Sequence, residues 1–270
     1  MQCFKNAQEI NEIAVLDRAF HYGDGCFTTA RIVDGQLQLA ARHYTRLKHA
    51  CQQLYLEVKL DYIEQSLQHL SANHKVVNGT VKIIVSRGVG QRGYSLPDTA
   101  ADLWLFYYPN QFKAAKPNII KSTVLHQTLG FSMPALVGLK TLNRLDQVIL
   151  KKELDDRGFI EALVCDVNQN IVEGVSSNCF MFINGQWITP KLGYNGVHGV
   201  LRAEILDRMQ HAEINCQVRN VASSEIQHIQ ALFFCNALNP MQIVSALDDR
   251  SLDTETPFTL FHHLQLDQIR

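Results

Sequence analysis

Residues 135–154 read Ala135-Leu-Val-Gly-Leu-Lys140-Thr-Leu-Asn143-Arg144-Leu-Asp146-Gln-Val-Ile-Leu-Lys-Lys-Glu-Leu154, and they decide the fold. Lys140 stands in apolar company just before a segment whose apolar residues recur at helical spacing. An amine held there is partly desolvated, which leaves neutral amine able to attack a carbonyl and form a Schiff base. The alternative is a lysine whose stem lies on apolar surface with its ammonium in water. Other parts of the chain must separate the two interpretations.

Composition predicts a globular protein that acts on a small molecule. The chain has 270 residues, of which 46% are hydrophobic and 19% charged, so it can bury a large core, and we expect two packed domains. A net charge of −1 without runs of like charge argues against nucleic acid or an anionic membrane as partner. The N-terminus has no basic region followed by an apolar stretch, and the apolar runs are short, so we expect a cytoplasmic protein with no membrane segment.

The cysteines and histidines predict neither disulfides nor a metal site. The seven cysteines are scattered and include no Cys-x-x-Cys pair, which is typical of reduced, packed thiols. The eleven histidines include no His-x-x-x-His pattern with a partner carboxylate, so no metal is expected.

The first half of the chain predicts a sheet with two helices. Tyr22-Gly-Asp-Gly25 marks a tight turn or a close backbone approach, and a strand over 26–33 follows it. A helix is predicted over 41–56, with Arg46 at the edge of its apolar stripe, where a solvated arginine is the simpler interpretation. Further predicted elements are a helix over 61–74 and strands over 80–86 and 102–108.

A glycine-rich loop at 87–94, Arg-Gly-Val-Gly-Gln-Arg92-Gly-Tyr94, carries three glycines and two arginines. The planar arginine fork matches a carboxylate bidentately, so such a loop suits an anionic substrate. A plain surface hairpin is the other interpretation. The polar, proline-containing stretch after residue 108 indicates a division into an N-terminal domain (1–112), a linker (113–118) and a C-terminal domain (119–270).

The second half predicts strands around a further glycine-rich turn. Strands are expected over 119–125, 161–166, 171–174, 179–183 and 187–189, with Asn184-Gly185 as a hairpin signal. Gly193, Gly196 and Gly199 precede a predicted helix over 200–211. Backbone amides at such a helix N-terminus can bind phosphate, although an ordinary turn fits the pattern as well.

Together these motifs resemble the fold-type IV pyridoxal-phosphate enzymes, which include branched-chain and D-amino-acid aminotransferases and aminodeoxychorismate lyases. The resemblance runs nearly end to end and rests on the Lys140 stretch, Glu173, Arg46 and the glycines before Arg202. Residues 22–31, 86–94 and 138–145 are most similar to the lyases. The resemblance implies a two-domain α/β fold that binds pyridoxal 5'-phosphate between the domains, in a homodimer with sites at the domain and subunit interfaces.

The resemblance also implies the roles of individual residues. Lys140 would hold the cofactor covalently and serve as the proton-transfer base, and Glu173 would lie at the pyridine nitrogen. The expected phosphate contacts are Arg46, the backbone of Val200 and Leu201, and the turn of Asn236 and Ala237. Ser177 and Asn178 would support the cofactor. Some related enzymes carry a threonine where this chain has Ala237, so a side-chain phosphate contact at that position stays open.

The implied reaction removes pyruvate from 4-amino-4-deoxychorismate to give 4-aminobenzoate, a step of folate biosynthesis. Arg92 and Tyr94 match loop positions that hold the substrate carboxylate in related D-amino-acid aminotransferases. Thr28 is expected as a polar contact near the reacting carbons. The alternatives are an aminotransferase for D- or branched-chain amino acids, which would use the same Lys140 and Glu173, and a cofactor-binding protein without turnover.

Overall fold

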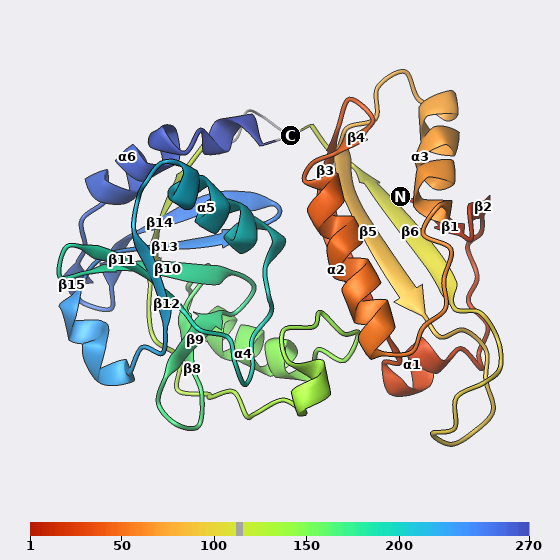
Figure 1. Ribbon diagram of the computed structural model, residues 1–270, viewed down its shortest axis with the longest axis horizontal. Coiled ribbons are helices and arrows are strands. Elements are labelled where there is room, and N and C mark those ends of the chain that lie inside the picture. Colours follow the sequence, from red (N-terminus) through yellow and green to blue (C-terminus); the bar gives the residue numbers. More distant parts are fainter. Residues whose placement is uncertain (112–115, 270) are drawn as a thin grey trace. The chain divides into compact units, whose positions relative to one another are not determined.

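The computed structural model describes residues 1–111 and 116–269, and its internal contacts divide the chain into two compact units (Figure 1). The first unit contains residues 1–111 and 139–143, and the second contains residues 116–138 and 144–269. Part of the expected linker over 113–118 lies outside the described residues. The boundaries proposed from the sequence therefore stay a prediction.

The first unit is built on a six-stranded antiparallel sheet with the strand order β2-β1-β6-β5-β3-β4. Its strands are β1 (Gln2–Lys5), β2 (Gln8–Glu9), β3 (Gly25–Val33), β4 (Gln36–Leu37), β5 (Gly79–Ser86) and β6 (Asp102–Pro109). Its helices are α1 (Arg18–Tyr22), α2 (Ala40–Gln53) and α3 (Tyr62–Asn73). The two long helices lie beside the sheet in Figure 1, with α2 against β3 and α3 against β6.

Alternation along β3 decides which side chains enter the core of this unit. Cys26, Thr28, Ala30 and Ile32 are buried, while the residues between them are only half-buried. Since neighbouring side chains on a strand point to opposite faces, Phe27 and Thr29 lie on the other face of the sheet. On α2, the buried positions Leu47, Ala50 and Cys51 recur at helical spacing, as the sequence predicts, and His43 one turn earlier is buried as well.

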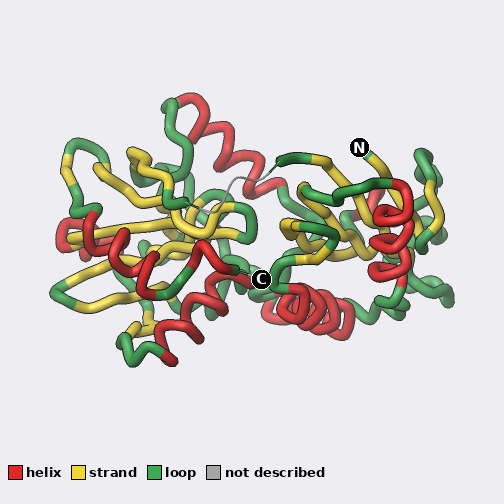
Figure 2. The backbone as a smooth tube through the Cα atoms, turned by 90° about the horizontal axis from the view of Figure 1, so that it is seen from above, coloured by secondary structure: helices red, strands yellow, loops and turns green. Residues whose placement is uncertain are grey.

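The second unit contains a mixed seven-stranded sheet, ordered β12-β11-β10-β13-β14-β15 with β7 beside β14. Its strands are β7 (Asn118–Ser122), β10 (Asn178–Ile183), β11 (Gln186–Pro190), β12 (Cys216–Arg219), β13 (Ile229–Asn236), β14 (Asn239–Leu247) and β15 (Arg250–Ser251), and β8 (Leu163–Cys165) pairs separately with β9 (Ile171–Gly174). Its helices are α4 (Leu145–Asp156), α5 (Val200–His211) and α6 (Glu255–His263), with short 3₁₀ turns at Pro134–Leu136, Ser223–His228 and Leu266–Gln268. Figure 2 shows the helices of this unit outside its strands.

Aromatic packing forms the centre of the large sheet. Phe180 and Phe233 stack with ring centroids 4.9 Å apart, and Trp187 meets Phe233 edge-on. The predicted hairpin at Asn184-Gly185 is confirmed: both residues have positive φ and join β10 to β11. All seven cysteines are free thiols, and six of them are buried. Within the described residues, no helix is long and apolar enough to cross a membrane.

The stretch around Lys140 pairs with the start of β3. The carbonyl of Lys140 accepts a hydrogen bond of 2.9 Å from the Phe27 N–H, and Leu142 N–H donates to the Gly25 carbonyl at 3.0 Å. Residues 139–143 therefore belong to the first unit, whereas the sequence places all of 119–270 in the C-terminal domain. The pairing uses backbone atoms only, so no side-chain pattern in the sequence signals it.

Candidate active site

The Lys140 ammonium lies over an aromatic ring. Its Nζ is 4.6 Å from the ring centroid of Phe27, and the Nζ of Lys82 is 4.9 Å from the same centroid. Lys82 comes from β5, where it pairs with Thr29 of β3, so it shares the sheet face of Phe27. A cation over a ring face is stabilised by the ring quadrupole. Two amines thus lie within 5 Å of the same ring centroid. Lys82 was not among the residues predicted from the sequence.

Thr28 and Arg46 meet inside the first unit, together with a histidine that the sequence analysis missed. The Thr28 hydroxyl is 2.6 Å from His43 Nδ1, and Arg46 Nη1 donates to the same hydroxyl over 3.4 Å. Because a guanidinium can only donate, the Thr28 hydroxyl accepts the hydrogen bond from Arg46 and also shares one with His43 Nδ1. Burial, with the Arg46 charge adding to it, lowers the pKa of His43 to about 3. The imidazole is therefore neutral.

The Thr28 side chain is buried and directed to α2, where it contacts His43 and Arg46. Its expected role near the reacting carbons stays a prediction. Thr29, the next residue, occupies the sheet face that carries Phe27 and pairs with Lys82. The other two predicted substrate residues, Arg92 and Tyr94, are exposed on the loop between β5 and β6.

In the second unit, Glu173 is a buried carboxylate with fixed hydrogen bonds. It is 5% exposed, and its Oε2 accepts from Asn178 Nδ2 at 3.1 Å and from the Val197 N–H at 3.0 Å. Asn178 also donates to the Val197 carbonyl. Burial lowers the pKa of Arg144, and the negative charge of Glu173 opposes that shift. The structure thus joins two of the expected site residues, Glu173 and Asn178, by a hydrogen bond.

Helix α5 offers backbone amides at its N-terminus. Its N-cap is Gly199, its first turn holds no acidic residue, and no side chain among the described residues caps it. The first amides of a helix lack partners within it and carry partial positive charge, so they suit an anion. A Cβ on Gly199 would lie 1.8 Å from Asn178 Oδ1, so only glycine permits this approach. Val200 and Leu201, which follow it, are buried.

Asn236 and Ser177, both expected at the site, contact one another. Asn236 Nδ2 donates to Ser177 Oγ at 3.0 Å, and Asn236 Oδ1 accepts from the backbone N–H groups of Leu238 and Asn239. The asparagine side chain thus shapes the turn between β13 and β14, which contains Ala237. Alanine supplies no polar side-chain atom, so only its backbone can contact a phosphate there.

Glu161 is a second residue that the sequence analysis missed. It is buried, and its carboxylate accepts from the Val175 N–H at 2.6 Å and from Ser176 Oγ at 2.7 Å. These bonds fix residues 175–177, the loop that joins β9 to β10 and lies between Glu173 and Asn178. The sequence placed Glu161 in a strand, and nothing local distinguishes it from a surface glutamate.

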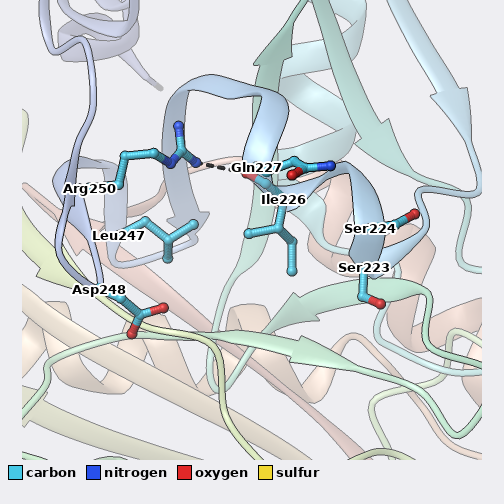
Figure 3. Close-up of a pocket in the computed structure, with 7 residues that line it drawn as sticks. All are labelled: Ser223, Ser224, Ile226, Gln227, Leu247, Asp248 and Arg250. Carbon is cyan, nitrogen blue, oxygen red and sulfur yellow. Dashed lines mark hydrogen bonds between the residues drawn. The ribbon is translucent and has the colours of Figure 1, made fainter.

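A pocket of about 430 Å³ in the second unit contains none of the predicted residues (Figure 3). It is lined by Ser223, Ser224, Ile226, Gln227, Leu247, Asp248 and Arg250. Arg250 donates to the carbonyls of Ile226 and Ile229, so its guanidinium holds the pocket wall together. No group of His, Cys, Asp and Glu able to hold a metal ion occurs in residues 1–111 and 116–269.

Each unit, taken by itself, carries groups of the kinds that can bind part of a phosphorylated pyridine aldehyde. The second unit supplies a buried carboxylate at Glu173 and an uncapped helix N-terminus at Val200, and the first supplies an amine at Lys140 and the Arg46 guanidinium. A carboxylate suits a protonated ring nitrogen, helix amides and a guanidinium suit a phosphate, and an amine suits an aldehyde.

Comparison with known proteins agrees with this chemistry. Residues 25–247 match the model of the family described as "Amino-transferase class IV". An aminodeoxychorismate lyase of Vibrio harveyi is 30% identical over 234 residues, covering 86% of each chain. A crystal structure of 4-amino-4-deoxychorismate lyase from Pseudomonas aeruginosa has a TM-score of 0.88 and 31% identity, and covers 99% of this chain and 100% of that one.

A third neighbour shares the fold at lower identity. It is a hypothetical aminotransferase from Mycobacterium tuberculosis in a PLP-bound form, with a TM-score of 0.83 and 18% identity over 99% of this chain and 98% of that chain. The expected fold-type IV architecture is therefore confirmed. The chain belongs to the class IV aminotransferase family, whose enzymes depend on pyridoxal phosphate.

Proposed function

We propose that this protein is a pyridoxal-phosphate-dependent lyase that converts 4-amino-4-deoxychorismate to 4-aminobenzoate and pyruvate. The observation that carries the proposal is the similarity to the Pseudomonas aeruginosa lyase, at 31% identity over 99% of this chain. We further propose a cytoplasmic homodimer that acts in folate biosynthesis.

The proposal assigns residues of both units to one cofactor, which when bound supplies an electron sink conjugated to the substrate amine. Lys140 provides the amine that attaches the cofactor. Glu173 keeps the ring nitrogen protonated, because a buried anion favours a neighbouring cation. Arg46 and the amides of Val200 and Leu201 bind the phosphate. Ser177, Asn178 and Asn236 keep these groups in place through the hydrogen bonds described above.

In the reaction, Lys140 takes the proton from the carbon that bears the amine. The electron pair of that C–H bond forms a new double bond in the substrate ring as the neighbouring C–O bond breaks, and the enolpyruvyl group leaves, takes up a proton and becomes pyruvate. Aromatisation of the remaining ring makes the step favourable. Arg92 and Tyr94 bind the substrate carboxylate, for which the guanidinium fork is suited. The Lys82 ammonium adds positive charge beside the Phe27 ring.

A specific observation supports an aminotransferase as the second candidate. Several relatives bear that name, among them a D-alanine aminotransferase of Staphylococcus aureus at 23% identity over 72% of this chain. The two reactions differ in whether they need a second substrate. Elimination would proceed without one, whereas transamination would require a 2-oxo acid to accept the amino group.

The test is a pyruvate-release assay with enzymatically made 4-amino-4-deoxychorismate and no added 2-oxo acid. We expect continuous pyruvate formation, matched mole for mole by 4-aminobenzoate, and its near-complete loss in Lys140→Ala. A strict requirement for a 2-oxo acid would instead establish the aminotransferase.

A further inference from the structure

Arg18 is a charged side chain buried in the first unit, beside the loop that carries Arg92. It is 3% exposed, and its Nη1 donates to the carbonyls of Gln91 at 3.3 Å and of Gly93 at 2.8 Å. Its Nε donates to Asp24 at 2.9 Å, and its guanidinium lies 4.8 Å from the ring centroid of Tyr22. The peptide carbonyls on both sides of Arg92 are therefore held by one guanidinium.

The loop also encloses the stem of Arg18. The Arg18 N–H donates to the Gly88 carbonyl, and the Gly93 N–H donates to the Tyr22 hydroxyl at 3.1 Å. A Cβ on Gly90 would lie 2.7 Å from Arg18 Cδ, so a larger residue at position 90 would collide with the Arg18 side chain. Gly90 thus permits close contact between the loop and the Arg18 side chain.

Asp24 connects this arrangement to the rest of the unit. Its Oδ2 accepts from both Arg18 and Arg87 Nε, the latter at 2.7 Å. Burial alone would raise the pKa of Asp24, but the hydrogen bonds and charges of Arg87 and Arg18 outweigh it and lower that pKa. Arg87 donates its other hydrogens to the carbonyls of Leu54 and Tyr55, after α2. The two arginines share one carboxylate, but only Arg18 contacts residues 91–93 through its side chain.

We propose that Arg18 is a positioning residue, which fixes the backbone at 91–93 and so directs the exposed Arg92 side chain to its anionic ligand. This inference rests on the proposed function, in which Arg92 binds the substrate carboxylate. A loop that is already ordered loses less conformational entropy when the substrate binds. Loss of Arg18 therefore weakens substrate binding, while the chemistry at Lys140 is unaffected.

Arg87 provides a matched control for Arg18. Both side chains are arginines, both are buried, and both bind Asp24. Arg18→Gln and Arg87→Gln each remove one positive charge that contacts the Asp24 carboxylate, so general damage to the fold is similar in the two variants. Arg18→Lys retains the charge and one donor group and serves as the conservative variant.

The experiment combines hydrogen–deuterium exchange with steady-state kinetics on the cofactor-loaded enzyme. In Arg18→Gln we expect the amides of Gly90 and Gly93 to exchange about tenfold faster. We also expect KM to rise about tenfold while kcat stays within about twofold of the wild-type value, because the variant loses binding energy that the substrate and the transition state share equally. In Arg18→Lys, KM should rise less than in Arg18→Gln. Arg87→Gln should change KM and this exchange by less than about twofold.

A double-variant cycle tests whether Arg18 acts through Arg92. If it does, Arg18→Gln adds little to the KM of Arg92→Gln, because the group that it directs is already absent. Additive effects, an unchanged KM in Arg18→Gln, or equal changes in Arg18→Gln and Arg87→Gln would each overturn the inference. A failure of the proposed function would be seen separately, because the wild-type enzyme would release no pyruvate. In that case the hydrogen–deuterium exchange of Arg18→Gln and Arg87→Gln would still show whether Arg18 holds the loop.

Discussion

The hydroxyl oxygen of Thr28 lies 2.6 Å from Nδ1 of His43, with both side chains buried between β3 and α2. The same hydroxyl receives a hydrogen from Arg46, so a strand residue and a helix residue together orient the guanidinium assigned to the phosphate. His43 Nε2 has no hydrogen-bond partner among the described residues. A neutral, buried histidine with one hydrogen bond costs stability, and its bond to Thr28 limits that cost.

Thr28→Val should weaken both the fold and phosphate binding. The substitution keeps the shape of the side chain but leaves His43 Nδ1 and an Arg46 donor without their partner, at a cost of about 1–3 kcal/mol in the free energy of unfolding. We expect a lower Tm for the apoprotein and a several-fold higher Kd for pyridoxal phosphate, measured by absorbance titration. Thr29→Val, on the other face of β3, is the control for Tm and should change it less.

Acid should destabilise the protein through His43. Its pKa is about 3 in the folded protein and about 6.5 when unfolded, so between these values the unfolded chain binds more protons. Stability is then fully present above about pH 6.5 and falls as the pH drops toward 3, with a slope of at most about 1.4 kcal/mol per pH unit from this one group. Denaturant unfolding at pH 4.5 and 7 measures the loss. In His43→Asn the difference between the two pH values should shrink, and an unchanged difference would contradict this assignment.

Glu173→Gln should impair catalysis more than folding. Glutamine can still accept the hydrogen bonds of Asn178 and Val197, but it lacks the charge that keeps a ring nitrogen protonated. We expect kcat to fall about 100-fold or more, as for the loss of a single preorganised electrostatic contact, with a Tm near that of the wild type. Glu161→Gln, which alters the carboxylate that holds the loop between β9 and β10, should instead lower Tm with a smaller effect on kcat.

Borohydride reduction should attach the cofactor to Lys140. Lys82 provides an internal comparison, because its ammonium approaches the same Phe27 ring. Peptide mass spectrometry of the reduced holoenzyme is expected to place the label on the peptide containing Lys140. A label on Lys82 or Lys121 would refute the assignment of the attachment residue.

Arg92 is expected to serve the partner's site in the proposed homodimer. If each site takes Lys140 from one chain and Arg92 from the other, a heterodimer of Lys140→Ala and Arg92→Ala chains has one site with both defects and one intact site. Chains that pair at random form heterodimers about half the time, so co-expression should recover about a quarter of wild-type activity. Activity no higher than that of the Arg92→Ala sites alone, with heterodimers verified by mass spectrometry, would show that Arg92 serves its own chain.

Local patterns in the sequence determined most of the secondary structure. Asn184-Gly185 forms the predicted hairpin because only a few residue types accept positive φ at both turn positions. Helix α2 follows from apolar residues at helical spacing, and α5 begins directly after Gly199, as its preceding glycines suggested. These features depend on neighbours within a few residues, which a single sequence displays directly.

Glu173, Asn178, Ser177 and Asn236 could be named as site residues only through a resemblance to a family, and their pairing was not predicted. Their types are compatible with many surface roles, and the second pair joins residues 59 positions apart. The distant contact depends on the register between β10 and β13, which pairs Asn178 with Cys235. Register is set by the packing of the whole sheet and cannot be read from either strand alone.

The sequence by itself determined most of the elements, the buried stripe of α2 and the candidate amine at Lys140. Only the tertiary structure decided that Thr28 contacts His43 and that Lys82 lies near the Phe27 ring. Neighbouring strand residues face opposite sides of the sheet, and the packing of the sheet selects which side is buried. Only the tertiary structure placed Arg18 against the loop of Arg92, 74 positions away in the chain by their residue numbers. Such contacts arise when the folded backbone brings donors and acceptors together, a property that no local pattern of residues encodes.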